Sequence, residues 1–381
     1  MASRHLAFAA LVVDAVVLLL LGGSLPAFAL AFRVPQDVAG LIFTANGLGF
    51  LVAVPACGVL GDRFGKRAVV GVSALGLAVG LLALAASRDL AAGLCAAALI
   101  GAASGSVESG ITAVLPELYP GREGFANNYA QAFFGVGATA GPLLLLVPGL
   151  GWRERLVLCG SAFVVLGAAF WLERRRDRRV PGSDWRSGIA ESLAVPGIGA
   201  SLLAMVLYTG VEVAVWGWLF AVVTRPGGAG PVWAVAELSG FWAAMGGGRF
   251  LAGALADRIE LPALIAAGTA LGVPALVLAL LLPSRVGALA AVVVCGLAFS
   301  GLWPSLVANG QRRHGQSAFV SALLVGAGGG GSLVVPAAFG FATARLGLPA
   351  ATAGLALLLA PVALLPRLAR AARGSPASAA S

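Results

Sequence analysis

The sequence predicts an all-α membrane protein with twelve transmembrane helices in two pseudo-symmetric six-helix bundles. The first observation is composition: 59% of the 381 residues are hydrophobic, only 11% are charged, and the mean hydropathy is +0.95. The second is continuity, because the apolar runs are long and unbroken rather than alternating, which excludes a transmembrane β-barrel. The third is a short motif that occurs once in each half of the chain.

Spanning segments are the first elements that the sequence defines. A helix that crosses a bilayer needs about 20 apolar residues, and short connections rich in Arg, Gly and Pro separate the candidates. The first run follows Arg4 and His5 like a signal peptide, but its apolar part exceeds the ~7–15 residues of a signal-peptide core, so we expect a retained span. The predicted spans are 6–32, 38–60, 68–87, 90–115, 124–148, 154–172, 191–223, 231–254, 261–282, 286–308, 317–344 and 349–366.

The basic residues predict the orientation. With the N-terminus inside, 18 of the 25 Lys and Arg residues lie on the inner side, Arg249 among them, and 7 lie outside. This asymmetry predicts an even number of spans in the cell (inner) membrane, with both termini in the cytoplasm. It also explains the net charge of +9 without nucleic acid as a partner.

A polar stretch from Glu173 to Ser187 divides the chain into two sets of six spans. We predict an N-terminal bundle at 1–172, a cytoplasmic linker at 173–190, a C-terminal bundle at 191–366 and a cytoplasmic tail at 367–381. The arginines of the linker could alternatively bind lipid headgroups.

A repeated hexapeptide marks both halves. The first copy reads Gly58-Val59-Leu60-Gly61-Asp62-Arg63, and it recurs as Gly253-Ala254-Leu255-Ala256-Asp257-Arg258. Both copies lie between the second and third span of their half, which favours two related units with a solute site between them. Extended by Gly65, Lys66 and Arg67, the first copy resembles the signature loop of the major facilitator superfamily. This resemblance implies the major facilitator fold.

The signature loop is a candidate gate. Asp62 lies near a helix end, where its carboxylate could cap a neighbouring helix or pair with an arginine and hold one face closed. The alternative is topology alone, with the basic residues keeping the loop in the cytoplasm. The gating candidates are Gly58, Asp62, Arg63, Lys66, Arg67, Asp257 and Arg258.

A narrower resemblance involves four other predicted spans. Glu108 followed by Asn127-x-x-x-Gln131-x-Phe133-x-Gly135-x-Gly137 resembles the fucose/galactose/glucose–proton symporter family. Tyr208-x-Gly210-x-Glu212 before Trp216-Gly217-Trp218, and Gly296-x-x-x-Ser300-x-x-x-Pro304, are similar to the same family. The resemblance implies proton-coupled uptake of a monosaccharide-like solute by alternating access.

Three acidic residues, Asp14, Glu108 and Glu212, lie inside spans, where a carboxylate is costly and marks a functional site, and Glu237 could lie in the outer part of the eighth span. Asp14 and Glu108 lie roughly 10–12 Å from the cytoplasmic boundary at about 1.5 Å per residue, and could face each other. Burial favours the protonated form of a carboxyl group, and a second carboxylate favours it further. Glu108 is therefore the main predicted proton carrier, assisted by Asp14 and Glu212, because His5 and His314 are expected in loops. Structural hydrogen bonds and sodium coupling are the alternatives.

Amide and aromatic side chains are the predicted solute contacts. Asn127 and Gln131 are one helical turn apart on one face, and amides both donate to and accept from sugar hydroxyls. Aromatic faces suit the apolar side of a sugar ring, although helix packing or an interfacial belt would explain them equally. The predicted solute-binding residues are Gln131, Asn127, Glu212, Trp216, Phe133, Asn46 and Trp303.

Two glycine-rich segments leave further expectations. The run 326–332 is interpreted as a hinge or a close-packing helix rather than a phosphate loop, because no strand precedes it. Gly137-x-x-x-Gly141-Pro142 partly resembles the fifth-span motif of proton antiporters, so a drug or metabolite exporter is an alternative function. A lipid-handling or non-transporting membrane protein is a third.

Enzyme chemistry is not expected. The sequence has no recognisable nucleophile–base set or nucleotide loop, and Cys57, Cys95, Cys159 and Cys295 stand alone in apolar segments, without metal-ligand spacing. We therefore predict no cofactor and no metal. The predicted partners are a sugar-like solute, a proton and membrane lipids, and we expect a monomer.

Overall fold

The structure is a computed structural model that describes residues 2–119, 123–174, 191, 193–224, 230–255, 259–314 and 318–366. Regular structure in these ranges is helical throughout. The helices of the first half are α1 (Ala2–Gly23), α2 (Leu25–Phe32), α3 (Gln36–Ala39), α4 (Leu41–Phe64), α5 (Lys66–Ala86), α6 (Leu90–Leu118), α7 (Glu123–Leu144) and α8 (Trp152–Glu173). Those of the second half are α10 (Ile198–Thr224), α11 (Pro231–Leu255), α12 (Leu261–Leu281), α13 (Arg285–Phe299), α14 (Leu302–His314), α15 (Ala318–Leu346), α16 (Leu348–Leu359) and η2 (Ala360–Ala363).

The predicted spans reappear as helices. By length and composition, nine helices in the described ranges are able to cross a membrane, with α13 and α14 counted as one. The fifth and eighth predicted spans are α7 and α11, and the twelfth is α16 with η2. The predicted fold class, an all-α membrane protein of twelve helices in two bundles, is confirmed. The predicted linker beyond Arg174 and the tail lie outside the described residues.

Two spans that were expected to be continuous are broken. The first ends at Gly23 and resumes at Leu25, where Pro26 occupies the first turn of the new helix. The tenth breaks between Phe299 and Leu302. Pro304 has no N–H to donate to the Ser300 carbonyl, so a helical hydrogen bond is missing at this break. The Ser300 hydroxyl donates to the Leu297 carbonyl at 2.6 Å.

Local sequence explains where several helices begin. The Asp89 carboxylate accepts a hydrogen bond from the Ala92 amide at 2.9 Å and caps α6. Ser284 caps α13 in the same way through the Gly287 amide. Gly65, between α4 and α5, has a φ of 100°, a conformation that glycine adopts without a steric penalty. This turn brings α5 back along α4.

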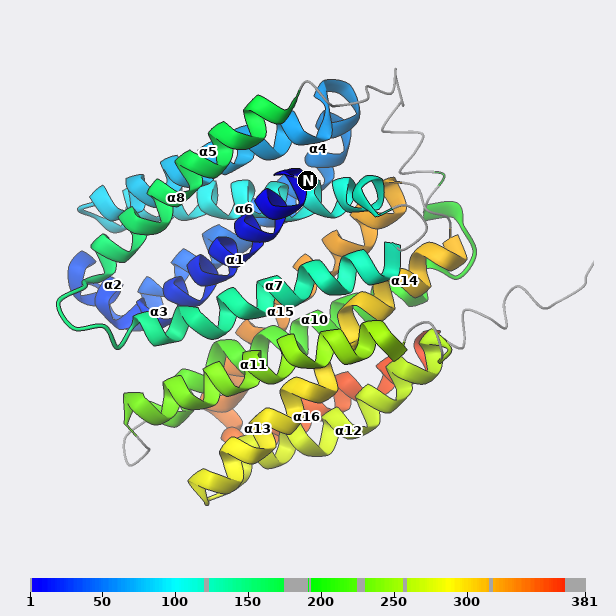
Figure 1. Ribbon diagram of the computed structural model, residues 1–381. Coiled ribbons are helices and arrows are strands. Elements are labelled where there is room, and N and C mark those ends of the chain that lie inside the picture. The colour runs from blue at the N-terminus through cyan, green and yellow to red at the C-terminus, as the bar shows by residue number, and fades with distance from the viewer. Residues whose placement is uncertain are drawn as a thin grey trace, which may run out of the picture.

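The helices form two groups that meet along two seams. In the first half α5 packs on α6 and α8, α4 packs on α6, and α1 packs on α7. In the second half α10 packs on α15, while α13 packs on α11 and α12. The halves meet where α7 contacts α11 and where α4 contacts α15, and Figure 1 shows α7 and α11 running side by side between the two groups.

Glycine crossings show that the halves are built alike. A Cβ on Gly137 of α7 would collide with the Val12 carbonyl of α1, and a Cβ on Gly331 of α15 would collide with the Val206 carbonyl of α10. These are the first and fifth spans of each half. Gly101 and Gly296 make the same kind of contact between the second and fourth spans, against the carbonyls of Asn46 and Phe241. Close backbone contact at small residues is how membrane helices associate.

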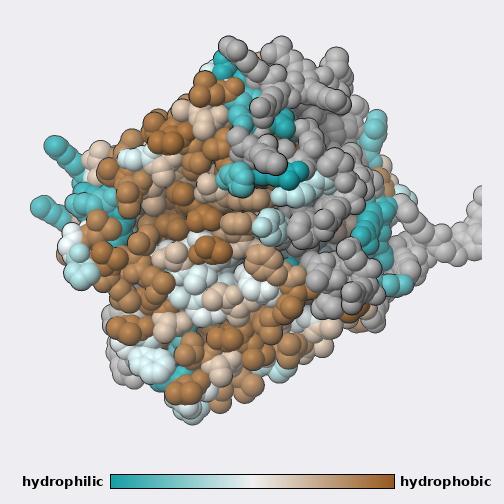
Figure 2. Space-filling view, viewed as in Figure 1, coloured by the Kyte–Doolittle hydropathy of each residue, from teal (hydrophilic) through white to brown (hydrophobic). Residues whose placement is uncertain are grey.

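The outer surface is apolar between two polar ends. Figure 2 shows a broad band of hydrophobic side chains, with hydrophilic side chains gathered at either end. Leu30, Val52, Leu172 and Leu357 are each more than 70% exposed, which lipid tails tolerate and water does not. The protein is therefore an integral membrane protein.

Candidate functional site

The acids of the first half are linked by hydrogen bonds inside the bundle. Asp14 of α1 is 3% exposed, and its Oδ2 accepts a hydrogen bond from the Ser104 hydroxyl of α6 at 3.0 Å. Its Oδ1 has no hydrogen-bond partner in the described part of the chain. Glu108 lies one turn after Ser104 on the same face of α6 and within electrostatic range of Asp14. The two acids therefore face the same interior space.

Gln131 joins α7 to this group. Its Nε2 donates to Glu108 Oε1 at 3.4 Å, and its side chain is buried. The polar chain from Asp14 to Gln131 thus crosses α1, α6 and α7, three helices that contribute predicted site residues. Asn127 lies one turn earlier on α7, but its side chain is outside the described residues.

The second half contributes Glu212 of α10, which is 6% exposed. Tyr208, one turn before it, interacts with the Glu212 carboxyl group, and the tyrosine hydroxyl donates to the Phe299 carbonyl at 3.0 Å. The tyrosine ring also packs edge-on against Phe299. This contact fixes the face of α10 that carries the acid.

Arg249 of α11 connects the two groups, and it was not among the predicted site residues. The charge count used it as an inner-side residue, and its side chain is only 3% exposed. Its Nη1 donates to the Gln131 carbonyl at 2.8 Å. Its charge interacts most strongly with Glu212 and also with Tyr208 and Glu108. The sequence signal was Gly248-Arg249-Phe250, a lone basic residue within an apolar run.

Helices α7 and α11 pack closely against each other along the length of the seam between the halves. Gly135 and Gly246 meet with no side chain between them, since a Cβ on Gly135 would lie 2.6 Å from the Gly246 Cα. Further along, the Ser239 hydroxyl donates to the Thr139 carbonyl at 3.1 Å. The bond from Arg249 to Gln131, the glycine crossing and the serine bond therefore tie the two halves together.

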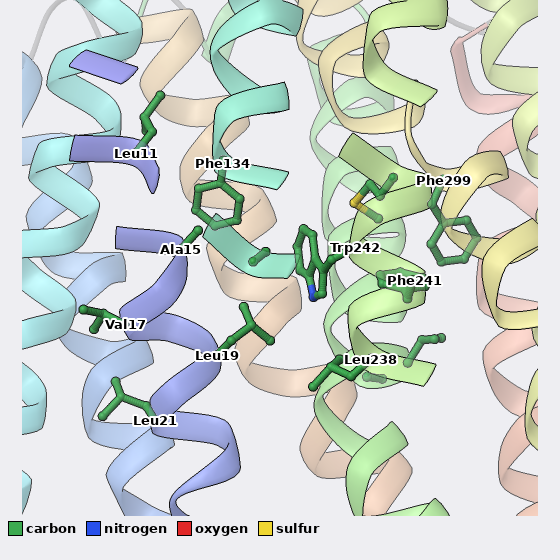
Figure 3. Packing of buried hydrophobic residues seen from close by; sticks show 14 of the residues in the cluster. Leu11, Ala15, Val17, Leu19, Leu21, Phe134, Leu238, Phe241, Trp242 and Phe299 are labelled. Atoms are coloured by element: carbon green, nitrogen blue, oxygen red, sulfur yellow. The ribbon is translucent and has the colours of Figure 1, made fainter. Parts of the chain in front are cut away.

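An aromatic cluster lies beside this seam. Trp242 of α11 is 2% exposed and stands 5.8 Å from the rings of Phe134 and of Trp216, measured between centroids. Phe241 packs edge-on against it. Figure 3 shows Trp242 between Phe134 and Phe241, at the junction of the two halves. Its Nε1 has no hydrogen-bond partner among the described residues, which leaves a buried donor at the edge of the site.

Other predicted contact residues take part in helix packing. Phe133 stacks on Phe8 at 4.6 Å and so joins α7 to α1. Asn46 donates to the Ala97 carbonyl at 3.4 Å across the α4–α6 crossing. Trp303 is partly buried against the apolar core of the second half. The structure does not bring these three side chains into hydrogen-bond contact with the acids.

The signature loop is partly described. Lys66 Nζ donates to the Ala113 carbonyl near the end of α6 at 3.1 Å, where a cation suits the helix dipole. Arg67 is buried, whereas Arg63 is exposed and lies over the Phe64 ring. Gly58 has open space around its Cα. The Asp62 side chain, Asp257 and Arg258 lie outside the described residues.

The prediction that both histidines lie in loops is wrong. His5 is an exposed residue of α1. His314 ends α14, is 8% exposed, and its Nε2 lies 3.0 Å from the Ser201 hydroxyl of α10. The sequence did not indicate that His314 is buried, because Arg312 and Arg313 precede it and mark a helix end.

Comparisons with known proteins agree on one family and one fold. A family model described as Major Facilitator Superfamily matches residues 6–336. The uncharacterised MFS-type transporter YfkL of Bacillus subtilis (strain 168) is 31% identical over 131 residues, which cover 34% of this chain and 32% of that protein. The multidrug resistance protein MdtG of Erwinia billingiae (strain Eb661) is 30% identical over 149 residues, which cover 37% and 36%. The chain thus matches about a third of the length of these curated relatives.

Solved structures extend the likeness to the whole chain. The crystal structure of the fucose:proton symporter FucP of E. coli superposes with a TM-score of 0.77 and covers 97% of this chain and 98% of that one. The sequences are 20% identical, so this similarity shows the fold alone.

Proposed function

The chain belongs to the Major Facilitator Superfamily, and on that premise we propose that it is a proton-coupled symporter of a monosaccharide-like solute that works by alternating access. The observation that carries the proposal is the polar group at the junction of the halves. There Glu108 bonds Gln131, faces Asp14 and lies within electrostatic range of Arg249. Transporter sites form where two repeats meet.

Glu108 is the proton carrier in this proposal. A carboxyl group inside a membrane protein is stable when neutral or when paired, so it can bind a proton on one side and release it on the other. Asp14 assists because it shares the same space and its Oδ1 is unpartnered in the described structure. Glu212, which lies in α10 of the second half, is a second candidate proton carrier.

The solute contacts combine amide, acid and aromatic groups. Gln131 and Glu212 offer donors and acceptors for hydroxyl groups, and Asn127 would extend the amide face of α7. Trp216 and Trp242 offer apolar faces for a sugar ring, and the Trp242 Nε1 offers a free donor among the described groups. The fold likeness to a fucose:proton symporter supports this solute class.

The gate and the membrane orientation complete the proposal. Both termini lie in the cytoplasm and the monomer is the working unit in the cell membrane. The signature loop, with Lys66 held on α6, closes the cytoplasmic face together with its second-half counterpart at Asp257 and Arg258.

Uptake into proteoliposomes tests the proposal. Labelled glucose, galactose and fucose are offered with an acidic exterior or with equal pH on both sides. We expect one of them to accumulate only with the gradient, and Glu108→Gln to lose accumulation while keeping exchange of solute at equal pH. Glu154→Gln, which changes an exposed acid at the start of α8, is the matched control and should accumulate solute normally.

Accumulation that ignores the gradient, or that survives Glu108→Gln, would contradict proton coupling through Glu108. A second candidate is a drug or metabolite exporter that exchanges solute for protons, which the match to a multidrug resistance protein favours. In that case lipophilic solutes, rather than sugars, would leave the vesicles against their gradient when the exterior is acidic.

A further inference from the structure

Arg249 is a buried cation held across the junction of the two halves. It belongs to α11, yet its guanidinium donates to a backbone carbonyl of α7, at Gln131. Its Nε has no hydrogen-bond partner in the described part of the chain. A buried guanidinium is costly unless opposite charges and acceptors surround it, so its surroundings decide where it is stable.

The opposite charges come from both halves. Glu108 of α6 and Glu212 of α10 both attract Arg249. The attraction acts through space, because the guanidinium bonds the Gln131 carbonyl rather than either carboxylate. Other titratable groups nearby are Asp14 of α1, which lies within electrostatic range of Glu108, and Tyr208 of α10 and Cys295 of α13, which lie within electrostatic range of Glu212. Arg249 is thus placed between one acid of its own half and one of the other.

The contact lies toward one end of the membrane span. We call it the signature-loop end, and it holds the Gly65 turn, the first turn of α7 and the last turn of α11. Gln131 lies two turns into α7, and Arg249 lies less than two turns before Leu255. In alternating access the halves must separate at this end, so the bond from Arg249 to Gln131 must then break.

We propose that Arg249 is a latch between the halves, closed while Glu108 is ionised and released when Glu108 takes up a proton. With Glu108 charged, Arg249 is attracted to the first half through both the carboxylate and the Gln131 carbonyl. With Glu108 neutral, the charged partner of Arg249 is Glu212, in its own half, and a neutral carbonyl alone holds it to α7. The proton comes from water at the far end and resides on a Glu108 oxygen.

This inference rests on the proposed function, because it takes Glu108 as the proton carrier. It adds a positioning residue that acts through Glu108 and converts its charge into the state of the gate. A purely structural arginine would stabilise the fold at every pH, and its loss would add to the loss of Glu108. If Arg249 is a latch, losing Arg249 and losing Glu108 should each open the signature-loop end to the same extent, and the two effects should not add.

Spin-label distances at the two ends of purified protein test the latch without solute. In a background with the four native cysteines replaced, Phe64→Cys with Arg312→Cys reports on the signature-loop end. Leu30→Cys with Val286→Cys reports on the far end. All four positions are exposed and lie in the last or first turns of α4, α14, α2 and α13.

We expect acidification to lengthen the distance between positions 64 and 312 in the parent protein. Arg249→Gln should lengthen it at every pH, with the open-to-closed ratio raised by roughly 5-fold or more, the lower range of allosteric coupling. Glu108→Gln should resemble Arg249→Gln, and the double variant should open no further. Arg249→Lys, which keeps the charge, should recover part of the closed state. Arg345→Gln, on the exposed end of α15, is the matched control and should behave like the parent.

An unchanged distance in Arg249→Gln, or additive opening in the double variant, would overturn the latch. Should Arg249→Gln fail to fold, Glu108→Gln decides, because a signature-loop end that stays closed at all pH values in that variant also overturns it. Failure of the proposed function looks different: the distances would follow the predicted pattern while solute uptake ignores the pH gradient.

Discussion

At the scale of single residues, Ser104 determines the surroundings of Asp14. Its hydroxyl donates a hydrogen bond to Asp14 Oδ2. The other carboxylate oxygen, Oδ1, has no hydrogen-bond partner among the described groups. A buried polar group that loses its partner costs about 1–3 kcal/mol, and more when it is charged. Ser104 is therefore a residue that the acid depends on, although it carries no charge.

Ser104→Ala should lower stability by about 1–3 kcal/mol because both Asp14 oxygens then lack a donor. The measurement is the thermal unfolding midpoint of the detergent-purified protein, with and without Asp14→Asn. The penalty should shrink in the double variant, since a neutral amide that loses a hydrogen-bond partner costs less than a charged carboxylate. Ser161→Ala, at an exposed serine of α8 that bonds its own helix, should change little. Equal penalties for Ser104→Ala and Ser161→Ala would contradict this account.

The sequence identified acids better than it identified the residues around them. Asp14, Glu108 and Glu212 stood out because a carboxylate inside an apolar run needs a reason. Arg249 was missed because a charge near a span end is normally explained by topology. The donor Ser104 was missed because serine is common in membrane helices. Phe133 was predicted as a solute contact, but aromatic residues look the same in sequence whether they bind solute or, as here, stack on Phe8.

At the scale of helices, the glycine run of the eleventh span is a packing surface. The segment 326–332 lies within the continuous helix α15, where Gly331 rests on the Val206 carbonyl of α10. Gly328 lies against Thr209 one turn earlier. The close-packing interpretation of this run thus agrees with the geometry, and the glycines let α15 approach the helix that carries Glu212.

Gly331→Ala should push α15 away from α10, because the new Cβ would collide with backbone that cannot yield. Gly330→Ala is the matched control, since a Cβ there meets nothing within 4 Å and alanine favours the helix. We expect Gly331→Ala to lose at least half of the monodisperse protein in size-exclusion chromatography and Gly330→Ala to match the parent. The same yield for both variants would argue against a packing role.

Element boundaries show what the helical pattern could and could not predict. Long apolar runs predicted nearly every helix, because composition and length decide whether a segment spans a membrane. The apolar pattern did not predict the breaks after Gly23 and after Phe299, although Pro26 and Pro304 lie close to them. A proline in a membrane helix is often accommodated by its neighbours, so its presence alone does not predict a break.

At the scale of the whole molecule, the two halves share one construction. Matching glycine crossings join the first to the fifth span and the second to the fourth span in each half. The repeated hexapeptide predicted this relationship from sequence, whereas the seam of α7 against α11 required coordinates. The polar group from Asp14 to Glu212 spans that seam.

Proton movement caused by downhill solute entry is the measurement that tests proton symport most directly. A transported sugar is added to proteoliposomes in weakly buffered medium, and the external pH is followed without any imposed gradient. We expect the medium to become alkaline as protons enter with the solute, and we expect Glu108→Gln to abolish the change while still exchanging solute. Solute entry with no change in pH, or with acidification of the medium, would contradict proton symport.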